Sequence, residues 1–266
     1  MVLYTPGRTS SYPDEPVESG IRIHFLGGGD EVGNVGVILE DETSTRLLID
    51  YGLAPTSPPR YPSEAPPVTD AIFTHTHIDH IGMAPWLVGN HQTKLHATSL
   101  TASLSRVMWK DTYKVSSIEG YPLPWDRRDE DEANEAWETH NYHQWAEYQN
   151  WKWQLHPAGH VPGAAMIEIE TPNHRILHSG DMDTRDGPNV NGAKPVECDI
   201  LLLEATYSGK DHPNRAEEEA RFVAKVVEVV ERGGIAIVPA FASGRGQDIL
   251  RILHSSGYDL NVHYDG

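Results

Sequence analysis

The stretch Ala71–His80 reads AIFTHTHIDH, so a short apolar run is followed at once by three histidines and an aspartate. A buried strand gains no stability from so many polar side chains at its end. Imidazole nitrogens and carboxylate oxygens are, however, ligands for Zn²⁺ and similar divalent ions. The stretch therefore predicts a strand that ends in a metal-binding loop, and the remaining sequence is interpreted outward from it.

The composition is typical of a globular chain whose metal ligands are nitrogen and oxygen atoms. With 266 residues, 38% of them hydrophobic, the chain can form one large core, or one domain and part of another. No apolar run approaches the roughly 18 residues that span a bilayer, so we expect no membrane segment. Residues 1–20 lack the features of a secretory signal and predict a flexible polar tail. The single Cys198 excludes a disulfide framework and is typical of a cytoplasmic protein.

The net charge is −18, from 39 acidic and 21 basic residues. Such a chain should repel nucleic acid at ordinary salt, because phosphate binding depends on Lys and Arg. At about 1 M salt the Debye length falls to about 3 Å, and local contacts then decide binding. We therefore predict a halophilic protein, and an acidic cytosolic enzyme at ordinary salt is the alternative.

The first half of the chain predicts strands joined by a glycine-rich turn. Strands are expected at 21–26, 35–40, 46–50 and 71–73, with the glycines of 27–33 between the first two. Because a strand and not a helix follows those glycines, the turn is no dinucleotide fingerprint. Its glycines are expected to let the chain pass close to another segment. A helix at 81–88 should follow the histidine cluster, with Asp79 and His80 at its N-terminal end.

The second half predicts helices, a hairpin and further strands. Helices are expected at 99–117, 215–232 and 246–254, a hairpin at 165–170 and 175–178, and strands at 199–203, 235–238 and 260–264. A further helix is predicted at 132–153, which carries Trp137, Trp145, Trp151 and Trp153. These tryptophans either stack on nucleic-acid bases or pack on the sheet. We favour packing, because the acidic residues between them would repel a phosphate backbone.

Three loops at strand ends collect residues that bind metals. They contain His75, His77, Asp79, His80, His160 and Asp181. His75 and His77 are separated by one residue in an extended segment, so they point to the same side and can share one ion. Asp79 and His80 lie beyond the turn and can serve a second ion, while His160 can close the first site. Asp181 can bridge the two ions through its two oxygens.

The order of these motifs resembles that of the metallo-β-lactamase superfamily. The chain shows a Gly-rich turn, His-x-His-x-Asp-His, Ala-Gly-His and Ser-Gly-Asp in that order. Residues 201–207 (LLLEATY) and 237–247 (IVPAFASGRGQ) further resemble the β-CASP ribonucleases, in particular archaeal relatives of ribonuclease J and of the cleavage and polyadenylation specificity factor endonuclease. The resemblance implies an α/β fold, with a metallo-β-lactamase αββα sandwich over 21–204. Residues 205–266 would be the opening part of an inserted α/β domain.

The resemblance also implies a role for each site residue. One zinc ion would be held by His75, His77 and His160, and the other by Asp79, which is also counted as catalytic, and His80, with Asp181 bridging them. Asp50 would orient the ligand loop, and Glu204 would act in catalysis by orienting a histidine that serves as general acid. That histidine and a further zinc ligand belong to later motifs of the family that this sequence does not contain. We therefore expect the N-terminal part of a longer chain, and a shortened, inactive relative is the alternative.

The implied function is hydrolysis of RNA phosphodiester bonds by a hydroxide that two Zn²⁺ ions activate. Single-stranded RNA would be the substrate, and Arg245 at the start of a helix could hold a phosphate. A small-molecule hydrolase of the same fold and an inactive RNA-processing subunit are the alternatives. The sequence leaves open whether cleavage is exo- or endonucleolytic, whether the metal is zinc or manganese, and whether the chain forms a homodimer.

Overall fold

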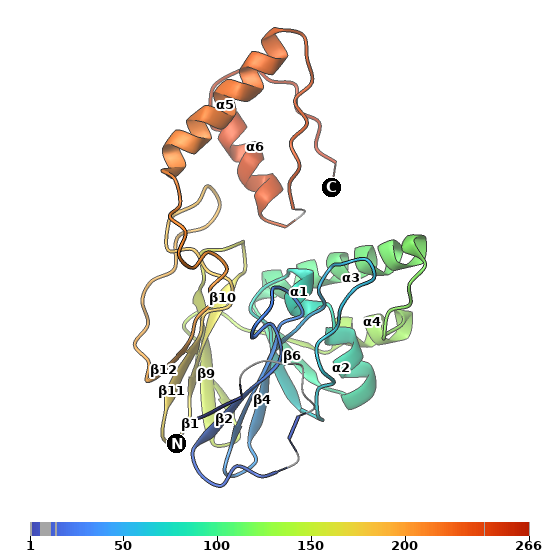
Figure 1. Cartoon of the computed structure of the whole chain (residues 1–266), viewed down its shortest axis with the longest axis vertical. Helices are drawn as coiled ribbons and strands as arrows, with labels where there is room; N and C mark the ends of the chain where they lie inside the picture. Colours follow the sequence, from blue (N-terminus) through green and yellow to red (C-terminus); the bar gives the residue numbers. More distant parts are fainter. Residues whose placement is uncertain (1, 6–11, 14, 242, 266) are drawn as a thin grey trace.

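The core of the protein is a pair of β-sheets, with helices against one sheet and two more helices beyond the strand ends (Figure 1). This computed structural model describes residues 2–5, 12–13, 15–241 and 243–265. The α/β class expected from the sequence is confirmed. Among the described helices, none is both long enough and apolar enough to cross a membrane.

The first sheet has seven strands that follow the order of the sequence. They are β1 (Val2–Thr5), β2 (Ile21–Gly27), β3 (Gly36–Asp41), β4 (Arg46–Tyr51), β5 (Asp70–Ile72), β6 (Lys94–Ala97) and β7 (Trp137–Thr139). β2, β3 and β4 pair antiparallel, whereas β4 to β7 run parallel. Because parallel strands end at one edge of a sheet, Asp50 near the end of β4 lies beside the segment that follows β5.

The second sheet has five strands, in the order β12-β11-β10-β9-β8. They are β8 (Ala146–Tyr148), β9 (Trp151–Pro157), β10 (Ala165–Glu170), β11 (Arg175–His178) and β12 (Ile200–Leu202). β10 and β11 pair antiparallel, which confirms the predicted hairpin. The loop after β9 carries His160, and the loop after β11 carries Asp181.

Alternating apolar side chains hold the two sheets together. In β9 the side chains of Trp151, Trp153 and Leu155 are buried, and the residues between them are only half-buried. This period of two is that of a strand with one face on the core. The three side chains belong to one cluster with Ile23, Val37, Leu39, Leu47 and Ile49 of the first sheet. These two tryptophans therefore pack in the core, as the favoured interpretation required.

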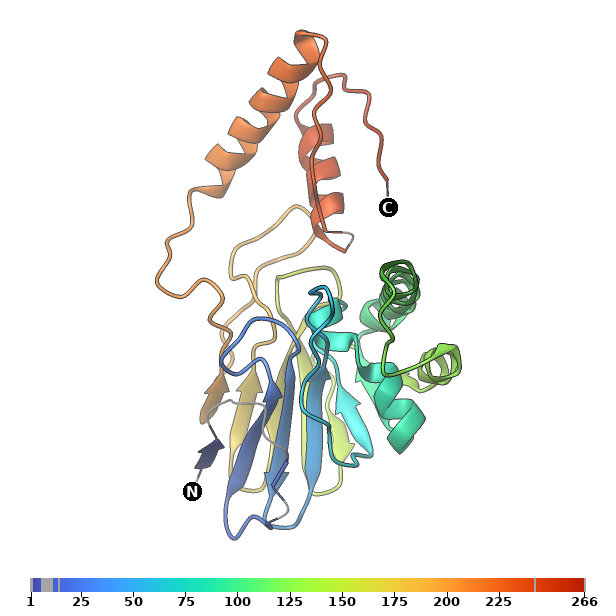
Figure 2. The ribbon, with the colours of Figure 1, turned by 45° about the vertical axis from the view of Figure 1, so that its right-hand side comes forward.

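Four helices cover the outer face of the first sheet (Figure 2). They are α1 (Ile78–Ile81), α2 (Ala84–His91), α3 (Ser99–Glu119) and α4 (Arg127–Glu135). α3 begins after Thr98, whose hydroxyl accepts a hydrogen bond from the Thr101 N–H, and it ends at the left-handed Gly120. The buried Trp109 of α3 donates a hydrogen bond to the Ile81 carbonyl. This bond fixes α3 against the turn that carries the histidine cluster.

The helix predicted at 132–153 is wrong. Helix α4 ends at Glu135, and the chain then forms β7, β8 and the start of β9. The cause lies in the side-chain spacing, because Trp151 and Trp153 alternate with polar residues and can share one buried face only in a strand. A capping box between Asp126 and Asp129 also starts α4 earlier than predicted.

The helix predicted at 81–88 is divided into two helices. α1 ends at Ile81 and α2 begins at Ala84. Between them the Met83 N–H donates to the Tyr51 carbonyl of β4, so it does not continue the helical ladder. Asp79 and His80 consequently lie inside the short α1 and not at the N-terminal end of a longer helix.

Part of the segment predicted as a flexible tail, residues 1–20, is held against the first sheet. β1 pairs in parallel with β2. The Tyr12 ring contacts the His24 ring edge-on, with ring centroids 5.2 Å apart, and its hydroxyl donates a hydrogen bond to Glu40. Residues 1, 6–11 and 14 lie outside the described part of the chain.

Helices α5 (Arg215–Glu231) and α6 (Arg245–Ser255) lie beyond the ends of the two sheets (Figures 1 and 2). Both were predicted, but the strands predicted at 235–238 and 260–264 do not form. Ile235 and Ile237 are 87% and 88% exposed. A strand needs a neighbour for its N–H and C=O groups, and neither segment has one among the described residues. The predicted domain boundary after Glu204 stays a prediction.

Candidate metal centre

The predicted ligand loops meet at one end of the two sheets. The loop with His75–His80 follows β5, while the loops with His160 and Asp181 follow β9 and β11. This end of the sheets faces α6 (Figure 1). Side chains from both sheets can therefore contribute to one site, while the strands behind them hold the loops in place.

The first group of candidate ligands is His75, His77, His160 and Asp181, and one candidate ligand atom from each lies within 4.8 Å of the others. His77 Nδ1 is 3.0 Å from His75 Nε2 and 3.2 Å from His160 Nε2. Asp181 Oδ2 is 3.8 Å from His75 Nε2 and 3.7 Å from His160 Nε2. Ligand atoms around a tetrahedral zinc, at roughly 2.0–2.1 Å from the ion, are about 3.3 Å apart. The donor set thus fits a zinc ion in both chemistry and size.

A second group lies beside the first and shares Asp181 with it. His80 Nε2 is 3.5 Å from Asp181 Oδ1 and 3.9 Å from Asp79 Oδ2. Asp181 therefore directs Oδ2 toward the first group and Oδ1 toward the second. This is the arrangement that a carboxylate bridging two ions requires.

A buried carboxylate, Asp50, fixes the orientation of the histidines. It is 0% exposed and accepts hydrogen bonds of 2.7 Å from the Thr74 N–H, the Thr74 hydroxyl and His80 Nδ1. Because His80 donates from Nδ1, its Nε2 keeps a lone pair for a metal. Thr74 accepts in turn from His75 Nδ1 at 3.0 Å, which frees His75 Nε2 in the same way. One carboxylate thus sets the tautomers of two candidate ligands.

Burial keeps the imidazoles of His75 and His160 neutral, which is the form that binds a metal. It lowers the pKa of His75 far below its usual value, and neighbouring imidazoles act in the same direction. Burial likewise lowers the pKa of His160 to about 4. Because a metal binds the neutral imidazole, both side chains can bind one at neutral pH without losing a proton.

His80 and Asp181 stabilise each other's charged form. Burial alone would lower the pKa of His80, but Asp50 and Asp181 raise that pKa well above its usual value. Burial alone would raise the pKa of Asp181, but His80 lowers it to about 2. The carboxylates around His80 therefore favour positive charge at this position, which a metal ion supplies in place of the proton.

Glycines allow the ligand loop to lie against the first sheet. A Cβ on Gly52 would lie 1.8 Å from the Asp79 carbonyl oxygen, so no other residue fits there. In the glycine-rich turn, a Cβ on Gly33 would lie 2.9 Å from the Ala54 Cβ. The nearby Val35 N–H donates to the Asp79 carbonyl at 2.9 Å. The close approach predicted for this turn is confirmed, and it holds the backbone of the loop.

Phe241, Ser243 and Gly244, which precede α6, contact the ligand loops. The Phe241 ring lies 6.3 Å from the His77 ring, between centroids, and the Ser243 and Thr76 hydroxyls are 2.9 Å apart. A Cβ on Gly244 would lie 2.5 Å from the side chain of Val161, in the loop that carries His160. Ala242 lies outside the described residues.

Three residues of this region were not assigned a role from the sequence. No sequence pattern marks Thr74, since only the pairing of β4 with β5 brings Asp50 against it. Phe241 and Ser243 belong to the family-like segment 237–247, which was the only signal for them.

Glu204 and Arg245 lie close to the ligand loops but make other contacts. The Glu204 N–H donates to the Ser179 hydroxyl at 3.0 Å, and its carboxylate accepts from the Thr206 N–H at 2.9 Å. Arg245 begins α6 and pairs with Asp248 at 3.3 Å. Its charge adds to the effect of burial on the pKa of His160. Among the described contacts, none joins Glu204 to a candidate ligand.

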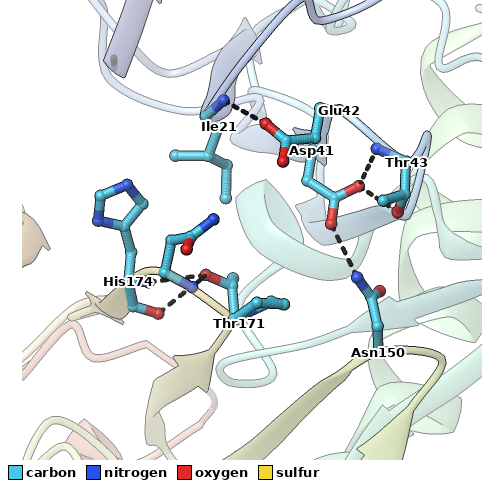
Figure 3. Close-up of a pocket in the computed structure, with 10 residues that line it drawn as sticks. Ile21, Asp41, Glu42, Thr43, Asn150, Thr171 and His174 are labelled. Carbon is cyan, nitrogen blue, oxygen red and sulfur yellow. Dashed lines mark hydrogen bonds between the residues drawn. The ribbon is translucent and has the colours of Figure 1, made fainter.

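A pocket at the opposite end of the sheets is lined by side chains that hydrogen-bond to the turns around it (Figure 3). Its wall is formed by the start of β2 and by the turns after β3 and β10. Asp41 accepts from the Thr43 N–H at 2.9 Å and from Asn150 at 3.2 Å. Thr171 accepts from the His174 N–H at 2.9 Å. Because these groups stabilise the turns, the pocket is not the candidate site.

Known structures agree with this fold. A crystal structure of a protein of unknown function from Enterococcus faecalis V583 matches 77% of this chain and 57% of that one. The TM-score is 0.51 and the sequence identity is 15%, so the likeness concerns the fold alone.

Curated relatives are more similar in sequence. "Probable RNase MJ4" of Methanocaldococcus jannaschii is 32% identical over 92% of this chain and 59% of its own length. "RNase aCSPSF2" of Saccharolobus solfataricus is 31% identical over 92% of this chain and 50% of its own length. "Cleavage and polyadenylation specificity factor 73" of Drosophila melanogaster is 31% identical over 91% of this chain and 36% of its own length. The chain thus spans about half the length of these relatives.

The domain that carries the converging loops also matches a described family. Residues 28–196, which include every candidate ligand, match the description "Metallo-beta-lactamase superfamily". The two sheets, the order of the ligand motifs and this match lead to one conclusion: the chain belongs to the metallo-β-lactamase superfamily.

Proposed function

We propose that the protein is a ribonuclease that hydrolyses phosphodiester bonds of single-stranded RNA with two Zn²⁺ ions. The observation that carries the proposal is the convergence of His75, His77, His160 and Asp181 within 4.8 Å. Ser243, from the segment that resembles the β-CASP ribonucleases, lies beside this group. Relatives named as RNases are similar over 92% of this chain. Because the chain spans only part of these relatives, the activity is proposed for the whole protein.

In this proposal each ligand has a defined task. The first ion is assigned to His75, His77 and His160, the second to Asp79 and His80, and both to Asp181. When bound, such ions polarise a phosphoryl oxygen and lower the pKa of the attacking water. The chain orients the ligands through Asp50, which holds His80 directly and His75 through Thr74. Asp79 and Asp181 would offset two of the four positive charges of the ions.

The substrate is assigned to the side of the centre that carries the segment 241–245. Phe241 is 78% exposed and lies beside His77, so a base could stack on its ring. The side chain of Arg245 is 54% exposed at the start of α6, so its guanidinium could hold a phosphate. Glu204 is assigned to positioning the general-acid histidine. The substrate would thus contact both the sandwich and the segment that follows residue 205.

The net charge of −18 opposes RNA binding at low salt. We therefore assign the protein to the cytoplasm of a halophilic cell, where screening removes this repulsion. We also assign residues 21–204 to the αββα sandwich and residues from 205 onward to the inserted domain. The protein is proposed to assemble as a homodimer.

The test is cleavage of a labelled single-stranded RNA by the full-length protein, at about 0.1 M and at molar KCl. Cleavage is expected with Zn²⁺ at molar KCl and should disappear on chelation and in His77→Ala, which should also lose metal. His254→Ala changes an exposed histidine of α6 and serves as the matched control. Full activity and metal content in His77→Ala would refute the site assignment.

Two other outcomes would replace the proposal. Turnover of a thioester, but not of RNA, would indicate a small-molecule hydrolase of the same fold. Binding of RNA without cleavage at every salt concentration, in the zinc-loaded protein, would indicate an inactive RNA-processing subunit.

A further inference from the structure

A second cluster of metal-ligating side chains lies at the β7 edge of the first sheet. His96 belongs to β6 and pairs directly with Glu138 of the neighbouring β7, and His140 follows the end of β7. One imidazole nitrogen from each histidine and one carboxylate oxygen of Glu138 lie within 4.8 Å of one another. None of the three belongs to the centre described above, so the cluster is a separate feature of the fold.

The nitrogen atoms of this cluster are arranged as in the first centre. His96 Nδ1 is 3.0 Å from His140 Nε2, the same separation as between His75 and His77. Glu138 Oε2 lies 3.9 Å from His96 Nδ1. The spacing of two imidazole nitrogens and one carboxylate oxygen therefore suits a single ion, with coordination positions left for water.

A carboxylate sets the tautomer of His96, as Asp50 does for His80. Asp70 Oδ1 accepts a hydrogen bond of 2.7 Å from His96 Nε2. His96 Nδ1 therefore keeps its lone pair and faces His140 and Glu138. Metal-binding histidines commonly show this carboxylate contact on their second nitrogen, where it raises the basicity of the ligand.

The other two ligands are also held in a binding form. Lys94 pairs with Glu138 Oε1 at 2.9 Å, which leaves Oε2 toward the histidines and lowers the pKa of this carboxyl. Burial lowers the pKa of His140, and His96 acts in the same direction. The ring centroids of His140 and Trp153 are 4.5 Å apart. The backbone N–H of His140 donates to the Ala97 carbonyl at 2.9 Å. Both the rotamer and the backbone of His140 are thus fixed beside His96.

We propose that His96, Glu138 and His140 form a second metal site, which binds one divalent transition-metal ion such as Zn²⁺ or Cu²⁺. Imidazole nitrogens favour these ions over Mg²⁺ and Ca²⁺. Asp70 is a positioning residue that orients His96. With neutral histidines, Asp70, Glu138 and Lys94 give the cluster a net charge of −1, which favours a cation. The ion joins β6 to the segment after β7 at the edge of the sheet.

The test is the metal content of the full-length protein after saturation with Zn²⁺ and dialysis. The parent should retain one more zinc ion per chain than His140→Ala, and RNA cleavage should be the same in both. His143→Ala removes an exposed histidine three residues later and should keep the parental zinc content. Equal zinc content in the parent and His140→Ala would overturn the proposal and leave only a hydrogen-bonded chain from Asp70 to His140.

A spectroscopic measurement keeps the proposal testable if His140→Ala does not fold. Glu138→Gln changes a half-exposed side chain without changing its size and should bind the additional ion at least tenfold more weakly. With Cu²⁺, electron paramagnetic resonance should show coupling to two imidazole nitrogens at this site, in the protein whose first centre is already filled with zinc. Parental affinity in Glu138→Gln, or a Cu²⁺ signal without nitrogen coupling, would contradict the assigned ligands.

Discussion

Replacing Asp50 by Asn should weaken the binding of the metal ion that is assigned to His80. Asn tolerates the left-handed backbone of position 50, where φ is +54°, so the exchange removes the charge without straining the chain. The new amide group would stand where Oδ2 now accepts from Thr74 and from His80 Nδ1. As a donor, it favours the His80 tautomer with a proton on Nε2. That proton occupies the position of the metal.

The expected loss of affinity is about 10–100-fold, which is the usual effect of losing a partner behind a metal ligand. This factor corresponds to about 1.4–2.7 kcal/mol. The three hydrogen bonds at 2.7 Å and the complete burial of the carboxylate place the effect toward the upper end. The ion assigned to His75, His77 and His160 should be affected less, because among these three only His75 is linked to Asp50, through Thr74.

The assay is a titration of the metal-free protein with Zn²⁺ against a competing chelator, in a His140→Ala background so that only the two binding steps of this centre remain. Asp211→Asn makes the same change of charge at an exposed position and serves as the control. Thr74→Val should show a smaller loss that falls on the His75 ion. Parental affinity for both ions in Asp50→Asn would refute the role of Asp50 in setting the tautomers.

Three further predictions concern other parts of the chain. Asp41 accepts five hydrogen bonds; burial alone would raise its pKa, but these bonds lower it. The resulting stability is present above about pH 4 and is lost as the pH falls through the folded pKa. Asp41→Asn should therefore lower the free energy of unfolding by about 1–3 kcal/mol at pH 7. In urea unfolding, the difference between parent and variant should shrink below about pH 4. Gly52→Ala should displace the Asp79 backbone and lower both metal affinity and the melting temperature, whereas Gly187→Ala, which meets only ordinary contacts at 3.6 Å, should change neither. Arg245→Ala should raise the KM for RNA about tenfold, the loss of roughly one charged hydrogen bond, with little change in kcat; an unchanged KM would exclude the phosphate contact.

The sequence predicted those features that depend on local patterns. The His-x-His-x-Asp-His motif after an apolar run located the ligand loop, and the positions of His160 and Asp181 after strands indicated that they would join it. Periodicity also located α3, α5, α6 and the β10–β11 hairpin.

The sequence could not reveal features that depend on long-range pairing. Thr74 acquires its role only because β4 and β5 are neighbours, and Ser243 only because the segment before α6 meets the ligand loop. The helix predicted at 132–153 does not form, because its aromatic residues are spaced for a strand from Trp151 onward. The alternation at Trp151 and Trp153 is a strand pattern that becomes decisive once a second sheet faces it.

The most direct test of the two-ion centre is a crystal structure of the zinc-loaded protein with diffraction recorded at the zinc absorption edge. Two anomalous peaks roughly 3.5–4 Å apart are expected in this centre, besides the separate peak proposed at His96, Glu138 and His140. One should lie among His75, His77 and His160, and the other beside Asp79 and His80, with Asp181 between them. A single peak, or two peaks away from these side chains, would contradict the proposed two-metal centre.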